Sequence, residues 1–342
     1  MTGGRTLLGQ GAAARQRAGG AAIAADGLVK IYKGGVRALD GFGFTVAAGS
    51  IFALLGPNGA GKSTTVKILT TLSRPTAGDA FIAGFDVLRE PGEVRRMIGV
   101  VGQRSGVDGA ATAVENLRLQ GRVHGLGAKR TSVRTAELLE RFRLTDAANR
   151  PARTYSGGMR RKLDIAIGLV HRPRVLFLDE PTTGLDPEAR ADLWREIQAL
   201  SEQDALTVLL TTHYLEEADR LADRLALIDR GRLVVEGAPE ELKAGLQGDT
   251  VQIELGTESL PELLPAELEQ LDAVRTFTAA GDRFRAQVEH GATALPAILS
   301  VLEGYRVPVV SATVSRPSLD DVYLQYVGHV YDRSGLDEGE AR

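Results

Sequence analysis

The chain has 342 residues, 43% of them hydrophobic and 25% charged, which is ordinary for a globular protein with one large and one small domain. Its formal net charge of −3 excludes an overall basic surface of the kind that binds nucleic acid. The absence of cysteine excludes disulfides and cysteine-ligated metals, and it is consistent with a reducing cytoplasm. No apolar run approaches the ~20 residues that a membrane-spanning helix requires.

The first 25 residues are rich in Gly and Ala and contain three Arg but no acidic residue. An organellar transit peptide would share this bias, but the stretch lacks an amphipathic period and its Gly pairs oppose a helix. It also lacks the apolar segment of a secretory signal. We therefore predict a disordered tail over residues 1–25.

The next part of the chain alternates short apolar runs with turn and helix signals. Residues 27–47 are predicted to form antiparallel strands, followed by a buried strand at Ile51–Leu55 and a helix that begins near Gly61. Further strands are predicted at residues 79–85, 98–101, 175–178, 206–211, 225–228 and 233–235. Near-continuous apolar strands are typical of a parallel sheet covered on both faces, and residues 114–144 have helical spacing. We predict an α/β domain with a helical insertion over residues 26–245.

After Lys243 the pattern changes, and Gly245–Gly248 is interpreted as a linker. Strands are predicted at residues 251–255, 274–279, 283–288 and 307–314, with helices at 260–270, 291–303 and 319–327. Apart from the last helix, this order is βαββαβ, which predicts a small α+β domain of ferredoxin-like type over residues 249–328. Residues 329–342 are predicted to be a second disordered tail.

The segment Gly56–Ser63 matches the pattern Gly-x4-Gly-Lys-Ser/Thr between a predicted strand and a predicted helix. The alternative is a chance Gly-rich turn, but such a turn would not require a strand directly before it and a helix directly after it. Glycines let successive backbone N–H groups face a polyphosphate, and the start of the helix adds partial positive charge. Lys62 is expected to reach the β- and γ-phosphates, Ser63 to ligate Mg²⁺ and Thr64 to donate to the α-phosphate. The predicted nucleotide-binding residues of this loop are Gly56, Pro57, Asn58, Gly59, Ala60, Gly61, Lys62, Ser63 and Thr64.

Polar residues that follow three of the strands are candidates for catalysis. Asp179 and Glu180 end the strand at 175–178, where α/β sheets bind ligands. Asp179 suits the Mg²⁺ shell and Glu180 suits a general base or water-orienting group, although a helix cap would also explain the pair. Gln103 is expected to ligate Mg²⁺ or position water, and His213 to sense the γ-phosphate. Alone, Gln103 is equally compatible with an exposed loop glutamine. A lone His is more often a surface residue, but the position of His213 at the end of a strand favours a functional role.

A third motif, Tyr155–Met159, contains Ser-Gly-Gly. With the phosphate loop, Gln103, Asp179-Glu180, and His213 in the same order, it makes residues 26–245 resemble the nucleotide-binding subunits of ABC transporters. The resemblance implies a P-loop NTPase cassette with a parallel-sheet core, an antiparallel β subdomain and a helical subdomain. It also implies ATP and Mg²⁺ as cofactors.

Ser156 and the two glycines after it form a capped helix start with bare N–H groups, which is a second phosphate-binding surface. The resemblance implies that two subunits pair head to tail, so that Ser156, Gly157, Gly158 and Met159 close over the partner's ATP and Asp186 couples the two sites. Tyr32 would then stack on adenine, although a packed strand tyrosine is the alternative. Two positions depart from many members: Tyr155 replaces Leu and Met159 replaces Gln, which removes one polar contact to the nucleotide.

Three stretches resemble a narrower group, the daunorubicin/doxorubicin-resistance type of exporter ATPase. They are residues 155–164, 211–219 and 318–323. This resemblance implies a separate ABC-2 type permease, export of a drug, antibiotic or lipid-like substrate, and a place on the cytoplasmic face of the cell membrane. A cassette ATPase acting on ribosomes or nucleic acid is the alternative, but no second cassette or coiled coil is present and no nucleic acid is expected. A metabolic kinase would not require Ser156–Gly158 or His213.

Overall fold

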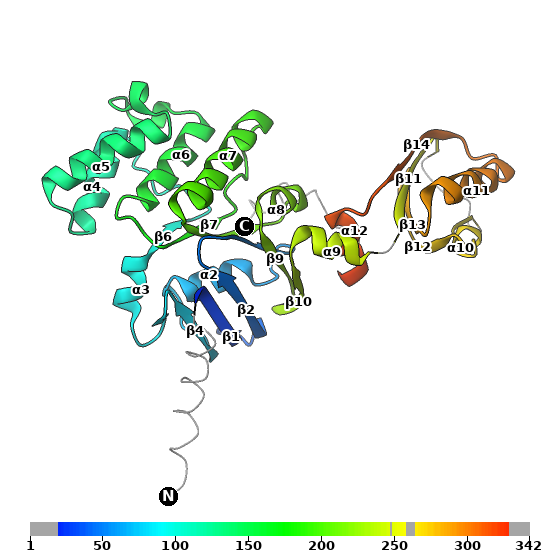
Figure 1. The fold of residues 1–342 in the computed structure, drawn as a ribbon, viewed down its shortest axis with the longest axis horizontal. Coiled ribbons are helices and arrows are strands. Elements are labelled where there is room, and N and C mark those ends of the chain that lie inside the picture. The colour runs from blue at the N-terminus through cyan, green and yellow to red at the C-terminus, as the bar shows by residue number, and fades with distance from the viewer. Residues whose placement is uncertain (1–19, 247, 258–263, 328–342) are drawn as a thin grey trace, which may run out of the picture. The chain divides into compact units, whose positions relative to one another are not determined.

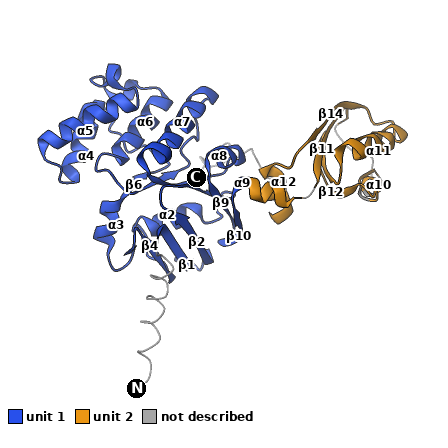
Figure 2. Ribbon diagram, in the orientation of Figure 1, with its two compact units in different colours: residues 1–239, 332–342 blue, residues 240–331 orange. Residues whose placement is uncertain are grey.

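The computed structural model describes residues 20–246, 248–257 and 264–327, and its described residues form two compact units divided between Pro239 and Glu240 (Figure 2). This division lies a few residues before the predicted boundary at residues 245–249. Helix α9 (Pro239–Gly245) is grouped almost entirely with the second unit, and Leu246 is buried rather than part of an exposed linker. Gly248 allows close packing: a Cβ there would lie 2.1 Å from the carbonyl oxygen of Val288.

The core of the first unit is a six-stranded sheet in the order β10-β9-β3-β8-β7-β6 (Figure 1). All neighbours are parallel except β10, which pairs antiparallel with β9 at one edge. The strands are β3 (Ile51–Leu55), β6 (Ile98–Val101), β7 (Val175–Asp179), β8 (Thr207–Thr212), β9 (Arg224–Asp229) and β10 (Arg232–Gly237). All five residues of β3 and all six of β8 are buried, which explains their continuous apolar pattern and confirms the predicted parallel core.

A second, antiparallel sheet has the order β2-β1-β4-β5. Its strands are β1 (Ala21–Ile31), β2 (Arg37–Ala47), β4 (Ala77–Ile82) and β5 (Phe85–Asp86). The predicted tail over residues 1–25 is too long, because residues 21–25 belong to β1. Ala22, Ile23, Ala24 and Ala25 are buried in this sheet, which a Gly- and Ala-rich composition concealed. The rest of that predicted tail, residues 1–19, lies outside the described residues.

Helices surround the two sheets. Helix α2 (Lys62–Leu69) contacts β2 and β4 of the antiparallel sheet and β7 of the larger one. The helical span predicted at 114–144 is two helices, because Gly125 turns the chain with a φ of +73°. The remaining helices of this unit are α3 (Pro91–Met97), α4 (Ala113–Val123), α5 (Ala128–Arg141), α6 (Gly157–Gly168), α7 (Pro187–Asp204) and α8 (Leu215–Leu221). Helix α4 contacts both α5 and α6, and the three helices form the predicted helical subdomain.

The second unit contains an antiparallel sheet in the order β12-β13-β11-β14. Its elements are β11 (Asp249–Leu255), α10 (Leu264–Glu269), β12 (Val274–Ala280), β13 (Arg283–Val288), α11 (Gly291–Gly304), β14 (Val309–Ser315) and α12 (Leu319–Val327). The first and third strands are central, as a split βαβ arrangement requires, so the predicted ferredoxin-like order is confirmed. The predicted tail 329–342 lies outside the described residues. Among the described helices, none is both long and apolar enough to cross a bilayer.

Candidate nucleotide-binding site

The loop Gly56–Gly61 joins strand β3 to helix α2 at the carboxyl end of the parallel strands. Two of its glycines have backbone conformations that side chains disfavour, with φ values of +81° at Gly59 and +116° at Gly61. Gly56 is required for another reason, because a Cβ there would lie 2.2 Å from the carbonyl oxygen of Ile228 on β9. The glycines therefore allow the tight turn that points backbone N–H groups into the loop.

Lys62 is the first residue of α2 and is only 5% exposed. Its ammonium group donates to the carbonyl oxygens of Gly56, at 2.7 Å, and Pro57, at 3.1 Å. Burial lowers the pKa of Lys62, while the charges of Glu180 and Asp179 oppose this shift. Lys62 thus supplies a desolvated positive charge inside the phosphate loop, where it favours an anionic ligand.

Asp179 ends strand β7 beside the start of α2. Its Oδ1 lies 3.4 Å from the Ser63 hydroxyl, so two of the three predicted Mg²⁺ ligands come together. The hydroxyl of Thr211, on neighbouring strand β8, donates to the same oxygen at 2.5 Å and accepts from the Glu180 N–H at 3.1 Å. Thr211 was not predicted as a site residue. Its place at the end of a buried strand next to β7 was the available signal.

The Glu180 carboxylate is surrounded by three polar side chains. The Nδ1 of His213 lies 3.3 Å from Oε1, and both Gln103 Nε2 and the Thr183 hydroxyl donate to Oε2 at 3.3 Å. The neighbouring imidazole of His213 is the main cause that lowers the pKa of Glu180. Gln103 contacts Glu180 rather than the two other predicted Mg²⁺ ligands, and Glu180 has a left-handed φ of +47°. Such strain in a polar residue is characteristic of functional sites.

Tyr32 follows strand β1 and lies beside the phosphate loop. Its hydroxyl is 3.3 Å from the Thr64 hydroxyl, while 38% of the residue remains exposed. The ammonium group of Lys30 lies 5.0 Å from the centre of the ring. Residues predicted to bind the base and the phosphates are therefore adjacent, with an aromatic surface available to a planar ligand.

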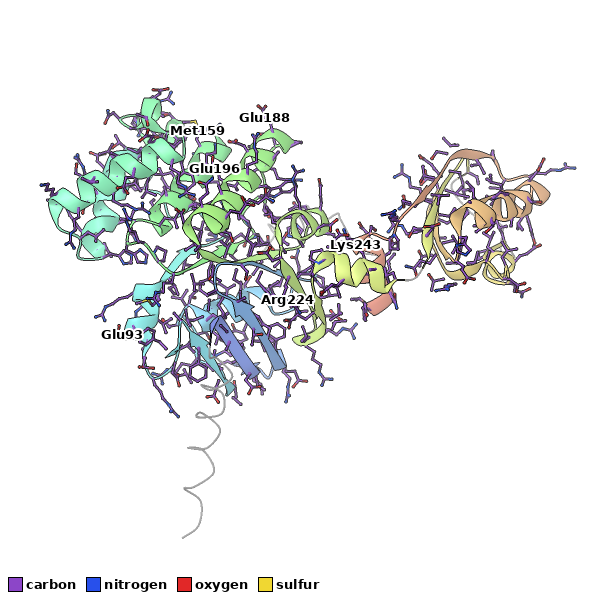
Figure 3. The ribbon with its side chains drawn as sticks, in the orientation of Figure 1. Glu93, Met159, Glu188, Glu196, Arg224 and Lys243 are labelled. Carbon is purple, nitrogen blue, oxygen red and sulfur yellow. The ribbon has the colours of Figure 1, made fainter. Side chains whose placement is uncertain are left out.

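Ser156 caps helix α6 by accepting from the Met159 N–H at 3.2 Å. A Cβ on Gly158 would lie 3.0 Å from the Cβ of Ala189, so this glycine lets the first turns of α6 and α7 approach closely. Asp186 caps α7 by accepting from the Ala189 N–H at 2.8 Å. The residues that were predicted to face a partner therefore lie together at the starts of α6 and α7. Figure 3 labels Met159 in the first turn of α6 and Glu188 in the first turn of α7.

The tyrosine that replaces leucine before Ser156 has a local explanation. Tyr155 is 5% exposed, and its hydroxyl donates to the carbonyl oxygen of Ala147 at 2.7 Å. The side chain is therefore a satisfied part of the helical subdomain's core. Its larger size leaves the capped start of α6 intact.

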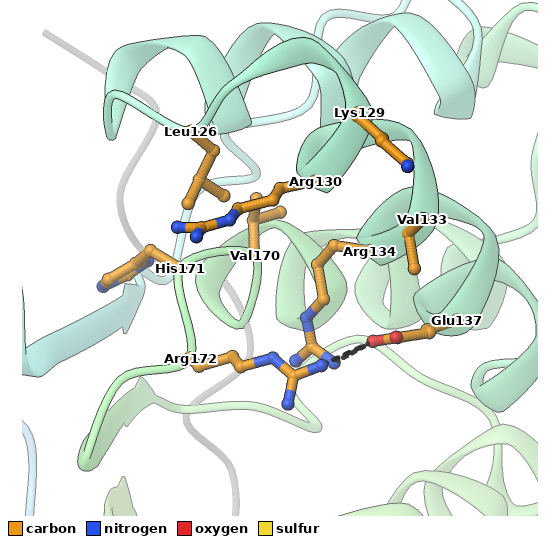
Figure 4. Close-up of a pocket in the computed structure, with 9 residues that line it drawn as sticks. All are labelled: Leu126, Lys129, Arg130, Val133, Arg134, Glu137, Val170, His171 and Arg172. Atoms are coloured by element: carbon orange, nitrogen blue, oxygen red, sulfur yellow. Dashed lines mark hydrogen bonds and ion pairs between the residues drawn. The ribbon is translucent and has the colours of Figure 1, made fainter.

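A separate cavity of about 450 Å³ lies in the helical subdomain (Figure 4). Arg134 and Arg172 each donate to the Glu137 carboxylate at 3.0 Å on its wall. The lining residues are Leu126, Lys129, Arg130, Val133, Arg134, Glu137, Val170, His171 and Arg172. None of them is a predicted site residue, so the cavity is distinct from the nucleotide site.

A glycine-rich phosphate loop, an acidic pair at the end of β7 and a Ser-Gly-Gly helix start, all on this sheet, define the class of ATP-binding cassette ATPases. The family described as "ABC transporter" matches residues 39–183, and "ATP-binding protein DrrA1-3-like, C-terminal domain" matches residues 237–327. The chain belongs to the daunorubicin/doxorubicin-resistance family of ABC transporter ATP-binding proteins, and it is an ATPase subunit.

Relatives over nearly the full length support this assignment. The chain is 45% identical to the daunorubicin resistance ATP-binding protein DrrA2 of Streptomyces coeruleorubidus, over 91% of this chain and 96% of that protein. It is also 45% identical to the daunorubicin/doxorubicin resistance ATP-binding protein DrrA of Streptomyces peucetius, over 93% and 96%. A dimeric, ADP- and phosphate-bound structure of the cassette MJ0796 matches with a TM-score of 0.58 and 27% identity, over 63% of this chain and 98% of that one.

Proposed function

We propose that the chain energises export of a drug, antibiotic or lipid-like substrate through a separate ABC-2 type permease. It would act as a head-to-tail homodimer on the cytoplasmic face of the cell membrane. The proposed mechanism of ATP hydrolysis rests on one observation: the Glu180 carboxylate contacts both Gln103 and His213. The names of the two Streptomyces relatives, both resistance proteins, support the choice of a drug-like cargo.

ATP and Mg²⁺ are the proposed cofactors. The Ser63 hydroxyl and the Asp179 carboxylate offer two oxygen ligands 3.4 Å apart, and the amide oxygen of Gln103 is the proposed third ligand. Hard oxygen ligands of this kind suit Mg²⁺, which would neutralise charge on the β- and γ-phosphates when bound.

The side chains around the phosphate loop would bind the phosphates, act on the attacking water and hold the adenine. Lys62 would exchange its contacts with the loop carbonyls for contacts with phosphate oxygens. Glu180, whose pKa is lowered mainly by the neighbouring His213, remains a carboxylate at neutral pH and can accept a proton from the attacking water or orient it. Tyr32 would stack on the adenine ring.

The start of α6 would bind the nucleotide of a second copy. Ser156 satisfies one N–H group, and the first turn leaves other backbone donors at the positive end of a helix of 12 residues. A triphosphate held by the phosphate loop of one subunit and by α6 of the other would join the two copies. Hydrolysis and loss of phosphate would remove the charge that both surfaces bind, so the dimer would open.

The permease would contact the helical subdomain near the Gln103 loop. Leu119 and Val123, four residues apart on α4, are 60% and 69% exposed, and Val100 on β6 is 40% exposed. Large apolar side chains so exposed on one helix face would form a contact surface for the permease.

Purification of the tagged chain from detergent-solubilised membranes tests this function. We expect a polytopic membrane protein to co-purify, and Leu119→Glu with Val123→Glu to release it while ATP binding is kept. Daunorubicin, used as a probe in proteoliposomes of the complex, should stimulate ATP hydrolysis. Recovery of ribosomes or nucleic acid in place of a membrane protein would support the alternative function.

A further inference from the structure

Arg161, one turn beyond the start of α6, is 8% exposed and has contacts that the proposed function does not use. Its Nη1 donates to the carbonyl oxygen of Gly102 at 2.7 Å, directly before Gln103. The other nitrogens donate to the turn that carries the general base. Their acceptors are the carbonyl oxygens of Pro181 at 2.8 Å, Asp179 at 3.0 Å and Glu180 at 3.3 Å. One guanidinium therefore joins two catalytic segments to one helix.

A second side chain of α6 holds the other end of the Gln103 loop. Asp164, 5% exposed, lies three residues after Arg161 on the same face of the helix and accepts from the Gly106 N–H at 2.9 Å. The loop is thus fixed to α6 on both sides of Gln103. Because both side chains are buried and their contacts with the loop are charge-assisted, we expect a movement of α6 to move the loop with it.

These contacts have a particular value at the Glu180 turn. Glu180 has a left-handed φ of +47°, a strained conformation that persists only where the surrounding structure holds it. Arg161 provides hydrogen bonds to the carbonyl groups of Glu180 and its two neighbours. A planar guanidinium with five donors can serve this set, whereas a lysine ammonium is a point charge with three donors.

We infer that Arg161 is a positioning residue that couples the partner-facing start of α6 to the Glu180 turn and the Gln103 loop of the same chain. The inference rests on the proposed dimer. When α6 binds the partner's nucleotide, Arg161 and Asp164 align Gln103 and Glu180 at the chain's own nucleotide. Each subunit then hydrolyses its ATP efficiently only while it also holds the ATP of its partner.

The direct test is Arg161→Lys, with Lys162→Met as the matched control. Lys162 is the next residue on α6 and forms an ion pair with Asp192 on α7, away from the catalytic turn. We expect Arg161→Lys to lower kcat about 10- to 100-fold, as misplacement of a catalytic group does, and to abolish cooperativity in ATP concentration. The affinity for ATP should stay within about two-fold, since Lys62 and its loop are intact. The control should keep both kcat and cooperativity.

A double variant separates positioning from dimerisation. Arg161→Lys combined with Glu180→Gln should still form the ATP-bound dimer, because Ser156–Gly158 is unchanged. The coupling would be overturned if Arg161→Lys kept wild-type kcat and cooperativity, or if ATP affinity fell in proportion to kcat. A wild-type chain that never dimerises would instead overturn the proposed function, and the coupling with it.

Hydrogen exchange in the full chain gives a measurement that does not depend on an Arg161 variant folding. The Gly106 N–H, which donates to Asp164, should exchange more slowly in the ATP-bound Glu180→Gln dimer than in the ATP-bound Ser156→Arg monomer. Equal exchange rates in the two states would overturn the inference.

Discussion

His213 Nδ1 lies 3.3 Å from Oε1 of Glu180, so an imidazole and a carboxylate meet at the ends of the paired strands β8 and β7. This contact is the main cause that lowers the pKa of Glu180. The pair therefore keeps the carboxylate ionised where we propose that water attacks the γ-phosphate.

Replacement of Glu180 by Gln should lower the rate of ATP hydrolysis about 10²- to 10⁴-fold, because the amide cannot accept a proton. Equilibrium binding of ATP should be unchanged. Phosphate release under saturating ATP measures the loss, with Glu202→Gln, an exposed carboxylate near the end of α7, as the control. Undiminished turnover in Glu180→Gln would remove Glu180 from its proposed role.

Thr211→Val should impair catalysis through Asp179. Valine has nearly the same shape but loses the hydroxyl that donates to Asp179 at 2.5 Å. A hydrogen bond to a charged group contributes about 1.5–3 kcal/mol, so we expect turnover to fall about 10- to 100-fold.

Thr207→Val provides the matched control at the opposite end of β8. It removes a hydroxyl that accepts from the Gly49 N–H at 2.9 Å, far along the strand from Asp179. This variant should lose about 1 kcal/mol of stability and keep its turnover. Equal turnover in the two variants would contradict the role of Thr211.

Tyr32→Ala should weaken ATP binding by about 1–3 kcal/mol, the range measured for stacking of a base on an aromatic ring. Tyr32→Phe keeps the ring and loses only the contact with the Thr64 hydroxyl, so its affinity should remain close to that of the wild type. Calorimetric titration with ATP distinguishes the two. If Tyr32→Ala bound ATP as tightly as the wild type, the ring would have only a packing role.

The helical subdomain should lose stability in mild acid because of His171, on the wall of the cavity in Figure 4. Burial, with a smaller effect from His124 stacked 3.7 Å away, lowers its pKa from 6.5 to about 4. As the pH falls, His171 therefore becomes protonated in the unfolded chain before it does in the folded chain. The stability is fully present above about pH 6.5 and is lost as the pH falls towards about 4, by roughly 1–2 kcal/mol once solvent screening of this half-buried ring is included.

His171→Gln removes this titration and should flatten the pH dependence over that interval. Urea unfolding, followed at neutral pH and near pH 4, compares the variant with the wild type. An unchanged pH dependence in the variant would show that another group is responsible.

Local patterns predicted much of the fold. The bounds of β3, β6 and β13 match the predicted runs, because each is a short apolar or alternating segment between clear turn signals. The start of β1 was wrong because alanines have little hydrophobic signal, although Ala22, Ala24 and Ala25 are buried.

Within the site, residues that follow strands or lie in the phosphate loop could be predicted because their position in a motif defines them. The contacts of Thr211 and Arg161 could not, although the place of Thr211 at the end of a predicted strand was a signal for its position. Their partners lie far along the chain, since Asp179 is 32 residues from Thr211 and Gly102 is 59 residues from Arg161. No local pattern encodes such contacts, which form only when the strands and α6 have packed.

The most direct test of the shared nucleotide site is the mass of the Glu180→Gln chain in solution, measured by light scattering with and without ATP and Mg²⁺. ATP should convert the 36.4 kDa monomer into a dimer of twice that mass. Addition of Ser156→Arg should prevent dimer formation without preventing ATP binding. A Glu180→Gln chain that binds ATP and stays monomeric, or a dimer that Ser156→Arg leaves intact, would contradict the account.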